Sequence, residues 1–347
     1  MRLLEPVGHV ERIEKLLRAA AGKRLAHALL FTGPEGIGKF LAAEWLAFGL
    51  LCARGPARPC GTCGPCKRLL AGTHADVLIV DPEAEGEEEI KISRITYREK
   101  DPQPNVGDFL ALKPMEGGWR VVILRDAGRM NEEAQNALLK TLEEPGTDTL
   151  LVLVASRPEA LLPTTRSRCV PVVLHPLDRA TAAGILRGQG IEAEEAAVLA
   201  RWSSGAPGAA LGLHARSAAA MRTAIEEVLR GDLDPLAAAA RIGELEGEFP
   251  GRTPASQARA RAKTFLDLVL AVLADLERAG AGLAAEALAH GDLAARVAAA
   301  GDARRRARLE VCLQARQDVE ANLLPDAILE RALLALEPGR HPSPAVP

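Results

Sequence analysis

An octapeptide near the N-terminus carries most of a phosphate-binding loop. Residues 33–40 read GPEGIGKF, and the pattern G-x-x-x-x-G-K-[S/T] is matched at every position except the last. In such a loop the backbone and the lysine hold phosphate oxygens, and the final hydroxyl binds the Mg²⁺ that bridges the β- and γ-phosphates. Phe40 replaces that hydroxyl, so we expect an anion cradle that has lost a metal ligand. The cradle residues are Gly33, Gly36, Gly38 and Lys39. The alternative is a glycine-rich turn that binds no ligand.

A second acidic position is consistent with a degenerate nucleotide site. Asp126 closes the apolar run 119–126, WRVVILRD, where proteins with this loop place a metal-binding carboxylate. Without the loop, the same residue reads as an aspartate that caps a turn after a strand. The sequence leaves open whether ATP or ADP binds, and Mg²⁺ is not expected to bind within this chain.

Four of the six cysteines lie close together in the sequence. Cys52, Cys60, Cys63 and Cys66 are spaced C-x7-C-x2-C-x2-C on a stretch rich in glycine and proline. Four thiolates suit a tetrahedral, structural Zn²⁺ with Zn–S bonds of about 2.3 Å. The alternatives are an iron–sulfur cluster, although the continuation C-x3-C-P of the ferredoxin run is missing, and unliganded thiols.

Bulk properties limit the classes of function. The 347 residues are 48% hydrophobic and 26% charged, as in globular proteins, and 43 Lys and Arg stand against 46 Asp and Glu. This balance does not indicate a nucleic-acid-binding protein. Glu5 comes too early for the apolar core of a signal peptide, and no apolar run reaches the length of about 20 residues that spans a bilayer. We therefore expect a cytoplasmic protein with reduced cysteines.

The elements that must position these residues alternate between strand and helix up to residue 175. Strands are predicted at 27–32, 76–81, 119–126, 149–155 and 170–174, and helices at 39–51 and at 131–143, where Asn131 is the N-cap. Alternation of this kind predicts an α/β fold in which helices cover both faces of a parallel sheet.

The second half of the chain is predicted to be helical. Short helices are expected over 177–213, interrupted at 188–190 and 205–208. Longer ones are expected over 215–336, with breaks at 235, 250–254, 280–282 and 325. Val311, Leu313 and Val319 are expected to mark the inner side of one late helix. The predicted domains are 1–175 with a zinc module inserted at 52–66, then 176–214, then 215–338, and residues 339–347 are expected to be disordered.

Several of these segments together resemble subunits of the bacterial DNA polymerase III clamp loader, in the AAA+ family. They are GPEGIGKF, the four-cysteine insert, Asp126-Ala127, NALLKTLEEP at 136–145 and SRC at 167–169. The strong motifs cover about 25–212, and residues 310–336 are loosely similar to the closing helices of that family. The resemblance implies a RecA-like AAA+ P-loop domain, a small helical lid and an all-α collar that mediates oligomerisation.

Departures from the ATP-hydrolysing gamma/tau subunits make the chain most similar to the delta-prime kind. Hydrolytic members carry Ser or Thr at Phe40, a water-orienting Glu at Ala127 and a sensor arginine at Gly208. The resemblance therefore implies no enzymatic activity of the chain alone. It further implies that Arg168 of the SRC motif, beside Ser167, reaches ATP on a neighbouring gamma subunit as an arginine finger, a role worth on the order of 10³–10⁵ in rate. By itself, the SRC tripeptide indicates no more than surface.

The resemblance also implies partners. They are the gamma/tau and delta subunits in a five-membered ring, the β sliding clamp and primed DNA, with the complex in the cytoplasm at the replisome on the nucleoid. Two other interpretations remain open. One is an active gamma/tau-like AAA+ ATPase that tolerates Phe40. The other is a DNA-binding protein built on the zinc module, which a net charge of −3 does not favour.

Overall fold

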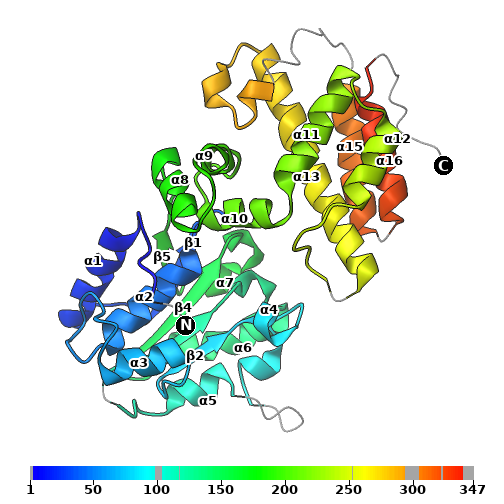
Figure 1. Cartoon of the computed structure of the whole chain (residues 1–347). Coiled ribbons are helices and arrows are strands. Elements are labelled where there is room, and N and C mark those ends of the chain that lie inside the picture. The colour runs from blue at the N-terminus through cyan, green and yellow to red at the C-terminus, as the bar shows by residue number, and fades with distance from the viewer. Residues whose placement is uncertain are drawn as a thin grey trace. The chain divides into compact units, whose positions relative to one another are not determined.

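The chain divides into two compact units, Met1–Leu177 and Asp178–Pro347, which Figure 1 draws in one view. The computed structural model describes residues 3–97, 104–116, 118–251, 253–293, 305–321 and 323–338. The unit boundary falls two residues after the predicted end of the first domain at 175. The predicted collar and all but the first two residues of the predicted lid lie within the second unit. The predicted disordered tail 339–347 lies outside the described residues.

A parallel sheet of five strands forms the centre of the first unit (Figure 1). Its strands are β1 (Ala28–Thr32), β2 (Val77–Val80), β3 (Arg120–Leu124), β4 (Thr149–Ala155) and β5 (Val170–Val173). They lie in the order β2-β3-β4-β1-β5, and every neighbouring pair is parallel. The five predicted strands and their parallel arrangement are confirmed.

The register of these strands brings the predicted nucleotide-site segments to one edge of the sheet. Thr32 at the end of β1 pairs with Ala155 in β4 and with Val173 in β5. Leu124 at the end of β3 pairs with Leu153 in β4. The carboxyl edge of a parallel sheet is where α/β proteins bind ligands, and the segments that begin at residues 33, 125 and 156 all leave the sheet there.

Helices cover both faces of the sheet (Figure 1). On one face, α2 (Lys39–Leu51) packs on β1, β3 and β4, and α1 (Val10–Ala21) packs on α2. On the other, α6 (Glu132–Glu143) joins a core of Leu30, Leu153, Leu138 and Leu142, and α5 (Val106–Ala111) lies against β3. Successive strand residues point to opposite faces, so two-sided burial explains why these strands read as continuous apolar runs.

The packing of α1 on α2 depends on a glycine. A Cβ at Gly49 would lie 2.6 Å from the Leu17 side chain and 2.8 Å from the carbonyl oxygen of Ala57. No real side chain fits at those distances, so Gly49 allows α1 to approach α2 closely. The sequence patterns above did not predict α1. Further short elements of this unit are α3 (Gly64–Ala71), α4 (Pro82–Glu85), η1 (Ile92–Arg94), η2 (Ala127–Arg129), η3 (Pro158–Ala160) and α7 (Pro163–Arg166).

Strand β5 forms one edge of the sheet and presents little to pair with. Leu174 N donates to Thr32 O at 2.8 Å, so the backbone groups of alternate residues, at 171 and 173, face outward. The outward positions hold Pro171, which has no N–H, and Val173, whose carbonyl oxygen accepts a hydrogen bond from Arg12. Of the backbone groups that face outward here, the N–H is missing at Pro171 and the carbonyl oxygen of Val173 is already bonded.

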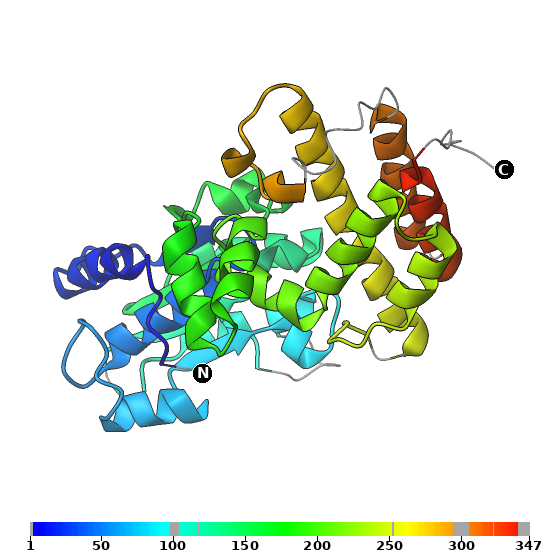
Figure 2. The same ribbon diagram turned by 45° about the horizontal axis from the view of Figure 1, so that its top comes forward.

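The second unit is helical, as predicted (green to red in Figures 1 and 2). Its described elements are α8 (Arg179–Gly188), α9 (Ala193–Trp202), α10 (Pro207–Ala215), α11 (Ala218–Arg230), α12 (Pro235–Gly243), α13 (Pro254–Gly280), η4 (Ala285–Ala287), α15 (Arg305–Glu320) and α16 (Pro325–Leu336). Their core is mostly aliphatic and includes the fully buried Phe265. Across the described ranges, no helix is both long and apolar enough to cross a membrane.

The predicted breaks fall at helix ends. Pro235, Pro254 and Pro325 each begin a helix, where the missing N–H removes no intrahelical bond. One prediction on α15 is wrong. Val311 and Val319 are buried, but Leu313 is 47% exposed, since two residues turn an α-helix by about 200° and place Leu313 on the opposite side from Val311.

A buried polar cluster lies among the helices of the second unit. Asp292 accepts hydrogen bonds from Arg201 on α9 at 3.1 Å and from Arg222 on α11 at 2.5 Å. His290 is 2% exposed, and its backbone N–H donates to Asp275 on α13 at 2.8 Å. The cluster therefore connects one of the short helices, α9, to two of the long ones.

Candidate nucleotide, finger and metal sites

The phosphate-binding loop has the backbone that its glycines predict. Gly33, Gly36 and Gly38 all have positive φ, at 140°, 76° and 91°, a region that favours glycine. A Cβ at Gly33 would lie 2.3 Å from the carbonyl oxygen of Leu174 after β5. The loop thus passes close to the neighbouring strand, and its shape requires glycine there.

Lys39 is engaged by protein atoms. Its Nζ donates to Gly33 O at 2.9 Å, to Pro34 O at 2.6 Å and to Ser156 Oγ at 2.8 Å. Burial lowers the pKa of this ammonium, whereas the charges of Glu35 and Asp126 raise it. An ammonium has three donors, and all three are used, so a phosphate would have to replace some of these bonds. Ser156, which follows β4, was not predicted.

The ring of Phe40 contacts a cationic side chain. The Arg125 guanidinium lies 5.0 Å from the centre of the Phe40 ring, a cation–π distance. Arg125 also donates to Asp81 Oδ2 at 2.6 Å. Position 40 therefore presents an aromatic ring with a cationic partner, where a hydrolytic loop has a hydroxyl.

Asp126 and Ala127 lie at the predicted edge of the sheet. Asp126 has a φ of 53°, and its carboxylate pairs with Arg129 at 2.8 Å. Ala127, at the position expected for a water-orienting glutamate, is fully buried. Gly208 lies in the first turn of α10 in the second unit, where it offers no side chain.

The N-terminal helix contacts the phosphate-binding loop. His9 precedes α1, is 5% exposed, and donates from Nε2 to Ile37 O at 3.0 Å. Burial lowers the pKa of this imidazole, as do the charges of Arg12 and His175. The loop is thus held from the α1 side as well as by Lys39. His9 was missed at the sequence level because a lone histidine carries no motif.

The SRC segment forms a compact turn after α7. Arg168 donates from Nη1 to Thr164 O at 3.0 Å and from Nη2 to Glu143 Oε1 at 2.5 Å, and Ser167 Oγ donates to Thr164 O at 3.1 Å. The Arg168 side chain is 36% exposed. Cys169 is buried in the core beneath, and burial raises the pKa of its thiol to about 11.

Cys52, Cys60, Cys63 and Cys66 come together in space. Their sulfurs all lie within 4.8 Å of one another, and Cys52 Sγ is 4.0 Å from Cys63 Sγ. A tetrahedral ion with bonds of about 2.3 Å needs sulfurs about 3.8 Å apart. Cys52 ends α2, while Cys63 caps α3 and Cys66 lies within it. The four thiols therefore fit a closed, four-coordinate metal site.

The thiols of this cluster have different surroundings. Hydrogen bonds from the backbone and hydroxyl of Thr62 lower the pKa of Cys60 to about 5, and burial raises the pKa of Cys66 to about 12. Cys60 and Cys63 are partly exposed, and all six cysteines of the chain are free of disulfides. A thiolate donor is thus available at the accessible side of the cluster.

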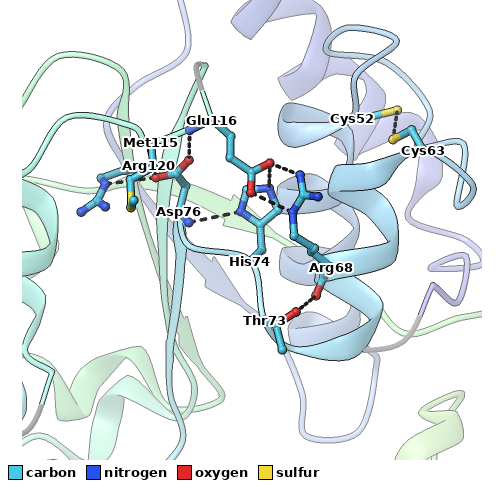
Figure 3. A network of polar contacts seen from close by, with 9 residues as sticks. All are labelled: Cys52, Cys63, Arg68, Thr73, His74, Asp76, Met115, Glu116 and Arg120. Carbon is cyan, nitrogen blue, oxygen red and sulfur yellow. Dashed lines mark hydrogen bonds and ion pairs between the residues drawn. The ribbon is translucent and has the colours of Figure 1, made fainter.

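A polar network that runs from the surface into the core ties the cysteine module to the sheet (Figure 3). Glu116 binds the Arg68 guanidinium on α3 through both carboxylate oxygens and lies 3.4 Å from His74 Nε2. The fully buried Asp76 accepts from the backbone N–H groups of Met115 and Glu116 at 2.8 and 2.9 Å. Asp76 N in turn donates to His74 Nδ1 at 3.2 Å. Helix α3 is therefore fixed to the segments that flank β2 and β3.

The fold and the loop define the class. A parallel sheet with a glycine-rich, lysine-containing loop between the inner strand β1 and helix α2 is that of the P-loop nucleotide-binding proteins, as predicted for an AAA+ clamp-loader subunit. Comparison with known proteins narrows the class further. The family described as "DNA polymerase III, delta subunit" matches residues 8–178. A protein from Pseudomonas aeruginosa named DNA polymerase III subunit delta′ is 37% identical over 229 residues, 65% of this chain and 67% of that protein.

The chain belongs to the family of DNA polymerase III delta-prime subunits, which confirms the predicted resemblance. The Bacillus subtilis protein of the same name is also 37% identical, over 48% of this chain and 47% of that protein, so this match spans about half of the relative's length. Among solved structures, a DNA polymerase III gamma-subunit-related protein from Thermotoga maritima has a TM-score of 0.46 and 18% identity, covering 92% of this chain and 97% of that one. As a family member, the chain is a component of DNA polymerase III and a clamp-loader subunit.

Proposed function

We propose that this chain is a non-hydrolytic clamp-loader subunit that lends Arg168 to an ATP site on a neighbouring subunit. The neighbours would be gamma/tau and delta subunits in a five-membered ring, and the complex would load the β sliding clamp onto primed DNA at the replisome. The observation that carries the proposal is a contrast within one domain. Arg168 is accessible and held in place, whereas the chain's own site has lost the groups that hydrolysis needs.

The contacts around Phe40 support the loss of hydrolysis. A functioning site needs an oxygen ligand for Mg²⁺ and a group that orients the attacking water. The ring of Phe40 packs under the Arg125 guanidinium instead, and the buried methyl of Ala127 can orient no water. Asp126, the remaining acid, is paired with Arg129. The cradle and Lys39 can still accept an anion, but they cannot build a metal-dependent hydrolytic site.

The geometry of the Arg168 segment supports the finger role. A guanidinium stabilises the charge that develops on the γ-phosphate, and it does so best when it is oriented before the reaction. Among the described residues, Arg168 has two hydrogen-bond partners, Thr164 O and Glu143. A guanidinium has five N–H donors, so three remain for a phosphate.

We also assign a structural role to the cysteine cluster. Zn²⁺ held by Cys52, Cys60, Cys63 and Cys66 would fix the end of α2 to the start of α3. The donor set supports a structural ion, because four thiolates leave no open coordination position for catalysis.

The test of the finger is Arg168→Ala in the complex reconstituted with gamma/tau and delta subunits. If the other fingers of the ring are removed by the same change in their SRC motifs, only the site facing Arg168 turns over. DNA-stimulated ATP hydrolysis at that site should then fall by about 10³-fold, and clamp loading should fall with it.

Arg166→Ala is the matched control, because Arg166 is also exposed, lies two residues away, and should leave the rate unchanged. Unchanged hydrolysis and loading in the Arg168→Ala complex would refute the finger.

A further inference from the structure

We propose that Glu143 is the positioning residue for the Arg168 finger. This inference rests on the proposed function, since Glu143 has this role only where Arg168 serves a neighbouring ATP site. The observation is the hydrogen bond of 2.5 Å from Arg168 Nη2 to Glu143 Oε1, made across 25 residues of sequence. Glu143 belongs to the segment NALLKTLEEP, to which no site role was assigned at the sequence level.

Helix α6 holds the finger segment, residues 161–169, in place. Gln135, two turns before Glu143, is 3% exposed and accepts a hydrogen bond from Leu162 N at 2.7 Å. Its amide donates to Met130 O at 3.0 Å and to Ala160 O at 3.3 Å. Gln135 thus fixes the backbone where the finger segment begins, and Glu143 fixes the guanidinium where it ends.

The backbone of the finger segment is anchored at both ends. Leu161 and Cys169 are buried in the same core as Leu138 and Leu142 of α6. Between them, α7 supplies the Thr164 carbonyl that accepts from Arg168 Nη1. With the backbone held, the main remaining freedom is rotation within the long Arg168 side chain. Glu143 and Thr164 restrict that freedom from two directions.

The place of Glu143 in its helix favours a role in binding a cation. It is the last residue of α6, and the C-terminal end of a helix carries partial negative charge that disfavours a carboxylate. Pairing with Arg168 offsets this. Glu144 follows directly and is exposed, and its side chain has no ion-pair or hydrogen-bond partner among the described residues, so the pairing is particular to position 143.

Glu143 could either orient the Arg168 side chain or withhold it from the neighbouring subunit. These two roles predict opposite effects of Glu143→Ala on ATP turnover. If Glu143 orients the guanidinium, Arg168 spends less time in the productive rotamer after Glu143→Ala, and turnover falls. If the ion pair instead withholds Arg168 from the neighbour, turnover rises. We infer orientation, because three guanidinium donors stay available while the pair is intact.

The experiment uses the reconstituted complex in which only the site facing Arg168 is active. With Glu143→Ala we expect kcat for DNA-stimulated ATP hydrolysis to fall about threefold to tenfold, and KM for ATP to stay within about twofold, since substrate binding resides on the neighbour. Glu143→Gln should retain at least about half of kcat, because the amide oxygen still accepts from Arg168. Glu144→Ala is the matched control and should behave as the unaltered chain.

A double variant separates failure of this inference from failure of the finger. Glu143→Ala added to Arg168→Ala should lower kcat no further, since both changes act through one group. A large effect of Arg168→Ala together with unchanged or raised kcat for Glu143→Ala would overturn the positioning role and leave the finger intact. If Arg168→Ala itself has no effect, the proposed function fails.

Discussion

At the residue scale, the adjacent residues Lys39 and Phe40 differ in how they match the phosphate-binding loop. Lys39 keeps the residue type of a phosphate-binding loop, and its three donors bind two loop carbonyls and Ser156. Phe40 has no oxygen that could bind a metal ion, and its ring contacts Arg125. Any nucleotide in this cradle would therefore be held by backbone and lysine contacts without a bridging ion.

This difference predicts that nucleotide affinity does not depend on Mg²⁺. Titration of the purified chain with labelled ATP should give the same Kd, within about twofold, in Mg²⁺ and in a chelator. The isolated chain should release no phosphate, and Phe40→Thr should introduce Mg²⁺ dependence but no turnover, because Ala127 orients no water.

Lys39→Ala serves as the control that locates any binding in the cradle. Phosphate release by the isolated chain that disappears in this variant would contradict the prediction and favour an active ATPase.

Residue types in short motifs were enough to predict the loop and the cysteine cluster, whereas the SRC segment gained interest only from the family resemblance. Their partners were not predictable. Ser156 lies 117 residues from Lys39, and Glu143 lies 25 residues from Arg168. Neither Ser156 nor Glu143 lies in a sequence motif that indicates a chemical role. Only the strand register and the packing of α6 identify them as partners. His9 escaped notice for the same reason.

At the element scale, α3 depends on the cysteine cluster at one end and on the Arg68–Glu116 pair along its length (Figure 3). A helix of eight residues is too short to be stable alone in water. Its stability must therefore come from these tertiary connections, and the proposed ion is the strongest of them.

The prediction is that the purified chain carries close to one zinc per molecule and that Cys63→Ser loses it. Thermal unfolding of the first unit should shift down by about 5 °C, as expected for a loss of about 2 kcal/mol in a unit of this size. Cys169→Ser is the control, since Cys169 is buried away from the cluster and its loss should not change zinc content. A metal-free native chain would exclude the structural ion.

Leu313 shows where prediction of a single element fails. Apolar type alone placed it with Val311 and Val319, although a separation of eight residues returns to the same side of a helix and a separation of two does not. The strands were predicted more accurately, because burial on both faces leaves long apolar runs in the sequence. The short helices α3 and α7 carry no such run and were missed.

At the scale of the whole molecule, the buried cluster around His290 makes the second unit sensitive to acid. Burial lowers the pKa of His290 to about 4, from an ordinary value of 6.5. Between these two values the unfolded chain binds a proton that the folded chain does not. The free energy of unfolding therefore falls as the pH falls through this range.

The expected loss between pH 6.5 and pH 4 is up to about 3 kcal/mol, because each unit by which the two pKa values differ is worth about 1.36 kcal/mol. It is measured as the denaturant midpoint of the second unit against pH. His290→Gln should flatten this dependence, whereas His214→Gln, at an exposed histidine of the same unit, should not. A dependence that survives His290→Gln would assign the acid sensitivity to other groups.

The outer side of β5 has a consequence for the chain before it joins a complex. A free strand edge recruits other strands and seeds aggregates. Here one outward position belongs to Pro171, which cannot donate, and the next, at Val173, already accepts from Arg12 of α1. This border therefore offers a strand of a second copy fewer free backbone groups than a fully open edge would.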